Sequence, residues 1–166
     1  MKIGIISDTH GYYDDSVHEY FKHCDQIWHA GDIGEGEIIE RLSQIAPVKA
    51  VFGNIDSIAF QQKYPEDLFF EVEGKKIFMT HIAGKPPRYN PRVKKLIKEK
   101  KPDLFICGHS HILRVIPDKE HNCLYINPGA AGKQGFHQMK TIIRFEINAG
   151  KVEHMEVVEL GKRGAK

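Results

Sequence analysis

Five short runs of apolar, mostly β-branched residues limit the fold of this chain more than any other feature. They span residues 2–7, 26–30, 48–52, 76–80 and 104–107. Continuous apolar runs of this length are typical of strands that are buried on both faces. Apolar residues at helical spacing lie between them, at residues 14–23 and 35–45, and Asn90-Pro91 is typical of the start of a third helix. This alternation predicts an α/β fold with a largely parallel first half.

Strand patterns replace helical ones after about residue 102. They lie at residues 113–116, 124–126, 141–147 and 152–158, and a hairpin turn is predicted at residues 148–150. We therefore expect a β-meander that supplies a second sheet, and overall two packed mixed β-sheets flanked by helices. The length of 166 residues favours a single domain over residues 1–160, followed by a flexible basic tail at residues 161–166.

Residues that can bind a metal ion follow each of the five buried runs. They are Asp8, His10, Asp32, Asn54, His81, His109 and His111. Ligands of open α/β sheets bind at the carboxyl ends of strands, where all of these residues are expected to lie. One residue separates Asp8 from His10 and His109 from His111. Side chains two apart in an extended chain point the same way, so we expect each pair to reach toward one point.

The ligand set comprises two carboxylates, one carboxamide and four imidazoles. Seven nitrogen and oxygen ligands are too many for one tetrahedral site and suit two divalent ions that share a bridging carboxylate. We expect Mn²⁺ first, with Ni²⁺, Fe²⁺ and Zn²⁺ as alternatives, because imidazole and carboxylate suit all four. Cys24, Cys107 and Cys123 are too widely spaced to form a thiolate clamp.

Single members of this set also have ordinary structural interpretations. Asp8 is also a suitable helix N-cap, and Asp32 and Asn54 are also typical turn residues after glycine. A histidine at the end of a strand, such as His81, is often only a surface residue. The order and number of the motifs, rather than any one of them, favour the metal centre.

Composition favours a soluble globular protein. The chain is 41% hydrophobic and 28% charged, and none of its apolar stretches approaches the roughly 20 residues that span a bilayer. Its formal charge of +2 predicts no surface for polyanions, so nucleic acid is expected only as a substrate. We expect a cytoplasmic protein without a membrane partner. Whether it forms a homo-oligomer stays open.

The ordered motifs Asp-x-His, Gly-Asp, Gly-Asn, His and Gly-His-x-His resemble those of the calcineurin-like metallophosphoesterase superfamily. The resemblance runs from residue 8 to residue 129 and is greatest to the small single-domain phosphodiesterase branch. It implies a four-layer α/β/β/α sandwich. It also implies one metal ion held by residues 8, 10, 32 and 111 and a second held by residues 32, 54, 81 and 109. Asp32 would bridge the two ions, and Asp32, Asn54 and His109 would be catalytic.

Such a centre favours phosphoester hydrolysis. With neutral imidazoles, two divalent ions and two carboxylates leave a charge of about +2, which attracts a phosphate ester. Ions roughly 3.5 to 4 Å apart lower the pKa of a bridging water and present hydroxide in line with the P–O bond. The expected enzyme is a metal-dependent phosphodiesterase whose nucleophile is the bridging hydroxide.

Ile55 occupies the position where phosphomonoesterases of this superfamily usually have a histidine that protonates the leaving group. An aliphatic side chain donates no proton, which favours diesters with good leaving groups. Phosphomonoesterase activity remains an alternative. A second alternative is a non-catalytic metal-binding scaffold, because a trafficking subunit of the retromer coat shares this fold.

Several residues near these motifs are further candidates for contact with the ligands or the substrate. Asp56 is either a carboxylate that orients an imidazole or a turn residue. Lys85, Arg88 and Tyr89 follow His81 and are candidates for contact with a substrate phosphate or base.

Small residues and one histidine make up the last group of candidates. Residues 127–132, which include Asn127 and Gly129, offer free backbone N–H groups to an anion. His137 is a spare donor near that loop. Trp28 is expected in the core rather than in a stacking platform.

Overall fold

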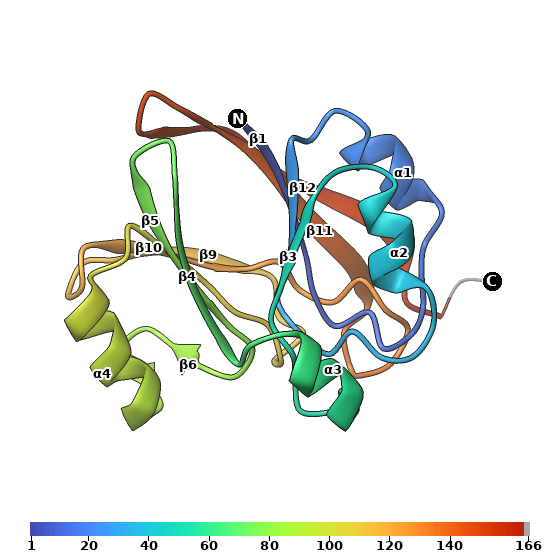
Figure 1. The fold of residues 1–166 in the computed structure, drawn as a ribbon, viewed down its shortest axis with the longest axis horizontal. Helices are drawn as coiled ribbons and strands as arrows, with labels where there is room; N and C mark the ends of the chain where they lie inside the picture. The colour runs from blue at the N-terminus through green and yellow to red at the C-terminus, as the bar shows by residue number, and fades with distance from the viewer. Residues whose placement is uncertain (165–166) are drawn as a thin grey trace.

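Two five-stranded sheets pack face to face in the computed structural model, which describes residues 1–164 (Figure 1). The first sheet has the order β12 (Lys151–Lys162), β11 (Met139–Asn148), β1 (Lys2–Ile6), β2 (Gln26–His29) and β3 (Val48–Ala50). The second has the order β4 (Asp67–Val72), β5 (Lys75–Thr80), β8 (Leu104–Ile106), β10 (Cys123–Asn127) and β9 (Arg114–Asp118). Strands β1, β2 and β3 are parallel to one another, as are β5, β8 and β10.

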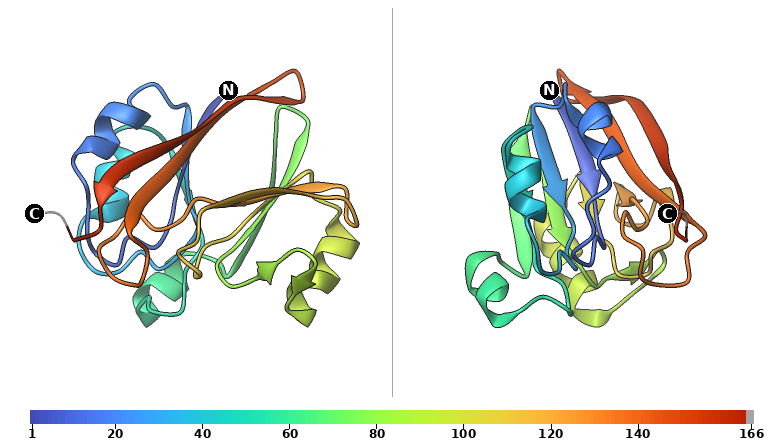
Figure 2. Two further views of the ribbon diagram at one scale, coloured as in Figure 1. Left: turned by 180° about the vertical axis from the view of Figure 1, so that it is seen from behind. Right: turned by 90° about the vertical axis from the view of Figure 1, so that its right-hand side faces the viewer.

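Helices cover the outer faces of both sheets (Figure 2). They are α1 (Ser16–Phe21), α2 (Ile38–Ser43) and α4 (Pro91–Lys100), while α3 (Ile58–Lys63) lies at one edge of the sandwich (Figure 1). Helices α1 and α2 lie against the first sheet and α4 lies against the second (Figure 1). The predicted fold class, two mixed sheets flanked by helices, is therefore confirmed. Asn90 caps α4 as predicted, because its Oδ1 accepts the Val93 N–H at 2.9 Å.

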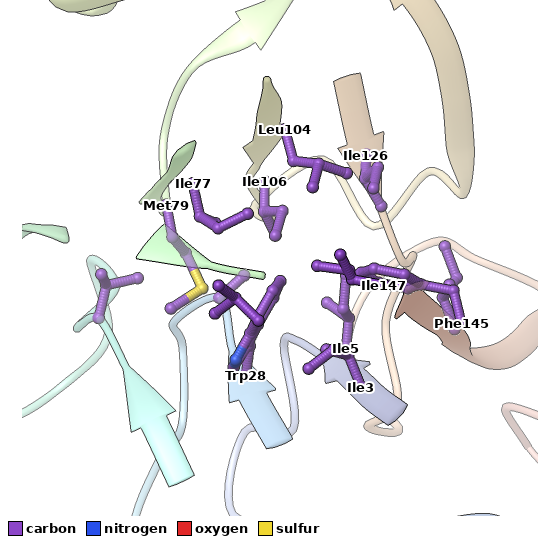
Figure 3. Close-up of a cluster of buried hydrophobic side chains, with 14 residues drawn as sticks. Ile3, Ile5, Trp28, Ile77, Met79, Leu104, Ile106, Ile126, Phe145 and Ile147 are labelled. Carbon is purple, nitrogen blue, oxygen red and sulfur yellow. The ribbon is translucent and has the colours of Figure 1, made fainter. Parts of the chain in front are cut away.

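The main core lies between the two sheets (Figure 3). Ile5 and Trp28 of the first sheet face Met79 and Ile106 of the second, and all four side chains are fully buried. Because side chains alternate along a strand, Ile6 instead packs in the layer beneath α1 and α2. Trp28 is thus a core residue, as expected.

The predicted meander is wrong, because β11 and β12 do not join the second sheet. Their hairpin extends the first sheet, where β11 pairs antiparallel with β1. Strand β1 therefore has neighbours on both sides, and its apolar residues stay buried. The second sheet combines β9 and β10 with β4, β5 and β8. The small hairpin of β6 (Gly84–Lys85) and β7 (Arg88–Tyr89) follows β5.

The expectation of a flexible tail from residue 161 is wrong for residues 161–163. Strand β12 continues through Lys162, and Arg163 donates hydrogen bonds to the carbonyl oxygens of His137 and Lys133. Residues 165–166 lie outside the described part of the chain. Within residues 1–164, none of the helices combines the length and the apolar character needed to cross a membrane.

Candidate metal centre

The loops that follow β1, β2, β3, β5 and β8 meet at one edge of the sandwich, where the carboxyl ends of both sheets lie together. Backbone hydrogen bonds join these loops. Asp8 N–H donates to Gly31 O at 3.0 Å, His10 N–H to Asp32 O at 3.0 Å and Gly108 N–H to His81 O at 3.1 Å. Hydrogen bonds between the loops therefore fix the backbone that carries the predicted ligands.

Two groups of potential ligand atoms form at this edge. One consists of Asp8, His10 and His111, the other of Asp32, His81 and His109, and the ligand atoms within each group lie within 4.8 Å of one another. Asp32 Oδ2 lies 3.4 Å from His10 Nε2 and 3.2 Å from His81 Nε2, so this carboxylate stands between the two groups. That position suits a bridging ligand.

Asn54 is exposed in the loop after β3. The next residue, Ile55, donates its N–H to Asp32 Oδ1 at 3.0 Å, which places this loop beside the second group. Coordination by the Asn54 amide stays a prediction.

The ligands converge for a different reason than the one we expected. Asp8 and His10 have φ values of 54° and 47°, and His109 and His111 have 70° and 59°. These residues adopt left-handed backbone, not the extended chain in which side chains two apart point the same way. As a result His109 and His111 belong to different groups, while His111 joins Asp8. Non-glycine residues in this strained conformation cluster at functional sites.

Glycines precede three of the ligands because neighbouring loops come too close for a side chain. A Cβ on Gly53 would lie 2.2 Å from both the backbone nitrogen and Oδ1 of Asp32. A Cβ on Gly108 would lie 2.1 Å from Ser7 Oγ and 2.7 Å from Asp8 Oδ2. The Gly-Asn and Gly-His motifs therefore permit the close approach that builds the site.

Three buried atoms point into the centre without a hydrogen-bond partner: Asp8 Oδ1, His10 Nε2 and His81 Nε2. The other oxygen of Asp8, Oδ2, is satisfied, because it accepts from Ser7 Oγ at 2.7 Å and from His109 N–H at 3.1 Å. Unpartnered buried polar atoms are costly, and cations that bind nitrogen and oxygen would satisfy all three. The residues of this edge thus fit divalent ions.

Hydrogen bonds to Nδ1 determine the tautomers of two of the histidines, His81 and His111. His81 Nδ1 lies 2.7 Å from Ala30 O, which only accepts, so the proton is assigned to Nδ1. The Nδ1 atoms of His111 and His137 are 3.3 Å apart, and His137 Nε2 lies 2.9 Å from Gly132 O. His137 therefore donates from Nε2 and accepts from His111 at Nδ1. The lone pair of His111 Nε2 is then directed toward Asp8 Oδ1, 3.2 Å away.

Charge within the centre favours ionised carboxylates. Burial alone would raise the pKa of Asp32, but the nearby imidazole of His81, together with the Ile55 N–H, lowers it below its ordinary value. Burial likewise would lower the pKa of His81, yet Asp32 and Asp8 raise it. Burial and the nearby His81 lower the pKa of His109, which favours its neutral, metal-binding form.

His29, which the sequence patterns did not single out, connects two of the ligand-bearing loops through hydrogen bonds. Its Nδ1 accepts the Gly31 N–H at 3.2 Å, so its proton lies on Nε2, 3.0 Å from Thr9 Oγ1. Thr9 in turn donates to Ile33 O at 2.8 Å. This chain links the loop after β1 to the loop after β2. The alternation along β2, which places residue 29 on the face opposite Trp28, was the only sequence signal for it.

Asp56 does not orient an imidazole through any hydrogen bond within residues 1–164. Its buried carboxylate accepts the N–H groups of Ile33, Gly34 and Gly53 at 3.2, 2.8 and 2.7 Å. Asp56 therefore joins the loops that carry Asp32 and Asn54. This is a structural role, as in the alternative interpretation of Asp56 as a turn residue.

Three other candidates near the centre are also structural. Asn127 Nδ2 donates to Gly108 O and Ser110 Oγ, and its Oδ1 accepts the Gly129 N–H. This residue holds the histidine loop rather than an anion. Tyr89, expected near substrate, is buried and donates to Asp118 at 2.8 Å.

A cavity of about 230 Å³ adjoins the centre at His109. Lys85 lines this cavity, whereas Arg88 is exposed and does not. Of the two basic candidates, only Lys85 therefore lines the cavity that adjoins His109.

Comparison with known proteins bears on the family and the fold. Residues 1–150 match the calcineurin-like phosphoesterase superfamily domain. A probable metallophosphoesterase of Methanothermobacter thermautotrophicus is 31% identical over 137 residues, or 78% of this chain and 77% of that protein. Vps29 from Entamoeba histolytica, complexed with Zn²⁺, superposes with a TM-score of 0.73 at 19% identity over 97% of this chain and 100% of its own. A structure described as a novel archaeal phosphodiesterase superposes with a TM-score of 0.72 at 22% identity over 96% of this chain and 99% of its own.

Proposed function

The chain belongs to the calcineurin-like phosphoesterase superfamily, and on this premise we propose that it is a phosphodiesterase that works with two divalent metal ions. The observation that carries the proposal is the pair of ligand groups with Asp32 between them. Their unpartnered buried atoms supply an independent reason for cations at this place. The proposed substrate is a small-molecule phosphodiester.

The chain's own residues would orient both ions and substrate. Two divalent ions bound here would supply positive charge for the phosphate oxygens and a water molecule of lowered pKa. Asp32 would be shared by both ions, and His81 and His111 are held with Nε2 toward the centre. His109 is the exposed member of its group, so it and the exposed Asn54 stand nearest to an incoming ester. Asp32, Asn54 and His109 are therefore the proposed catalytic residues.

A diester is preferred to a monoester because no proton donor occupies position 55. Ile55 is 45% exposed, and its only polar contribution at the centre is the N–H that binds Asp32. Without an acid, departure of the alcohol depends on its own stability as an anion. The similarity to an archaeal phosphodiesterase supports this choice.

The likeness to Vps29 keeps a metal-binding scaffold as the second candidate. Because that Vps29 structure is a Zn²⁺ complex, metal binding alone does not separate scaffold from enzyme. The present chain has a residue of ligand type at all seven predicted positions, which favours the enzyme.

The deciding experiment measures turnover of bis-p-nitrophenyl phosphate by chelator-stripped protein, with and without Mn²⁺, Ni²⁺, Fe²⁺ or Zn²⁺. Metal content per chain is measured on the same samples. Metal-restored turnover with about two ions bound is expected, with Mn²⁺ tried first. Two ions without turnover would support the scaffold, and faster hydrolysis of p-nitrophenyl phosphate than of the diester would support a monoesterase.

A further inference from the structure

The cavity beside His109 is built from segments of the second sheet. The turn after β5 contributes Ala83, and β6 contributes Lys85. The beginning of β9 contributes Arg114, and Ile112 and Tyr125 complete much of the wall. His109 belongs both to this cavity and to the second group of metal ligands. A substrate whose phosphate lay at the metal centre would therefore extend one of its ester groups into the cavity.

The wall offers mainly apolar contact. The hydroxyl of Tyr125 is already engaged, since it donates to Gly84 O at 2.9 Å and accepts from the Cys107 thiol at 3.2 Å. Ile112 is 53% exposed, and an occupant of the cavity would shield it from water. An apolar cavity of about 150 Å³ holds a benzene molecule. A cavity of about 230 Å³ therefore accommodates a single ring system such as a nucleobase, but not a long acyl chain.

Two cations border this apolar space. Lys85 and Arg114 line the cavity, and no carboxylate lines it with them. Within residues 1–164, neither side chain forms an ion pair, whereas Arg92 and Arg144 each pair with an acidic residue. Free cations beside an apolar cavity are complementary to a ring that carries a negative charge.

We propose that this cavity is a subsite for a nucleoside arm of the substrate diester, with Lys85 and Arg114 binding a second phosphate on that arm. This inference rests on the proposed phosphodiesterase function and specifies its substrate class. Lys85 and Arg114 are thus specificity-determining residues, because they contact the arm and not the phosphorus that reacts.

The kinetic test compares two chromogenic diesters, thymidine 5′-(4-nitrophenyl phosphate) and the same compound with a 3′-phosphate. The 3′-phosphate is expected to raise kcat/KM about fivefold to tenfold, which lies within the combined range of two partly exposed ion pairs. Arg114→Gln and Lys85→Gln should each remove most of this preference. Lys119→Gln, an exposed cation just beyond the far end of the strand that Arg114 begins, should preserve it. Equal kcat/KM for both diesters in the wild type would overturn the proposal.

A binding test needs no turnover and no metal. Calorimetric titration of chelator-stripped protein compares thymidine 3′-monophosphate with thymidine. The monophosphate is expected to bind at least about fivefold more tightly, and Arg114→Gln to abolish that difference. Ile112→Ala should weaken both ligands, while Ile58→Ala, an exposed isoleucine outside the cavity, should weaken neither. Tighter binding of the monophosphate without diester hydrolysis would refute the proposed phosphodiesterase function but support the subsite. Diester hydrolysis without nucleotide binding would support the phosphodiesterase function but refute the subsite.

Discussion

The imidazole of His137 lies against that of His111, with their Nδ1 atoms 3.3 Å apart, and it is anchored on its other side by the carbonyl of Gly132. This contact fixes which nitrogen of His111 is free for a metal ion. Partners of this kind orient the ligand ring and raise its basicity. His137 is therefore a positioning residue for the group of Asp8, His10 and His111.

Removal of the His137 imidazole should weaken metal binding at one group only. We expect His137→Ala to lower affinity for one of two ions by about 10- to 100-fold, because His111 loses its orientation. Titration against a chromophoric chelator measures both affinities. His154→Ala, at an exposed histidine in β12, is the matched control. Unchanged affinity of both ions would show that the contact does not support metal binding.

Replacement of Asp32 should abolish turnover. Asp32→Ala removes the carboxylate that stands between the two ligand groups, so both ions should bind more weakly and hydrolysis of bis-p-nitrophenyl phosphate should fall to background. Asp32→Asn, which keeps the shape but not the charge, should retain part of the metal content. Asp15→Ala, an exposed aspartate, controls for loss of a carboxylate. Full metal content and activity in Asp32→Ala would contradict the bridging role.

Asp56→Ala should destabilise the fold. Three N–H groups would lose their buried acceptor, and the free energy of unfolding should fall by about 3 kcal/mol or more, since each such group costs about 1 to 3 kcal/mol when unpaired. Urea denaturation at constant m-value measures the change. A loss below about 1 kcal/mol would mean that water replaces the carboxylate.

Gly108→Ala should disturb both stability and metal binding. The added methyl would collide with Ser7 Oγ and crowd Asp8 Oδ2, and forced overpacking of this kind costs about 1 to 3 kcal/mol. Thermal unfolding and metal titration report the two effects. Gly164→Ala, where an added Cβ would meet no atom within 4 Å, should change neither.

Acid should destabilise the metal-stripped protein through His29. Burial lowers the pKa of this histidine to about 4, whereas in the unfolded chain its value is near 6.5. Between these values the unfolded chain binds more protons, so stability rises with pH. The free energy of unfolding that depends on neutral His29 is fully present above about pH 6.5. It falls by up to about 3 kcal/mol as the pH decreases toward about 4.

Urea denaturation between pH 7 and pH 4.5 measures this slope. His29→Asn, whose Oδ1 substitutes for Nδ1 as acceptor of the Gly31 N–H, should flatten it, and His23→Asn, at an exposed position, should not. An equally steep acid slope in His29→Asn would assign the effect to other groups.

Short sequence patterns predicted most of the strands and the ligand residues that follow them. The strand that contains Ile5 and the loop that contains Asp8 are examples, because an apolar run and the polar residues after it are neighbours in the sequence. The cap at Asn90 is equally local. Helix α3 escaped prediction because it buries no side chain fully and so shows no apolar periodicity.

Features that depend on distant contacts were not predictable. The pairing of β11 with β1 joins the two ends of the chain, and no local pattern distinguishes it from a meander. The family resemblance implied that His109 and His111 serve different ions, but strand alternation predicted the opposite, because it takes no account of the left-handed backbone at both residues. The sequence placed His137 near the site only by proximity to a loop, while its contact with His111 depends on how that loop folds back.

Each group of ligand atoms draws on both sheets. Asp8 and His10 follow β1 whereas His111 follows β8, and Asp32 follows β2 whereas its companions His81 and His109 follow β5 and β8. An ion bound in either group would therefore cross-link the two sheets at their shared edge, and removal of the ion would remove the cross-link. At a free ion concentration 100 times its dissociation constant, one bound ion raises the free energy of unfolding by about 2.7 kcal/mol. The free energy of unfolding would then depend on the concentration of free metal ions around the protein.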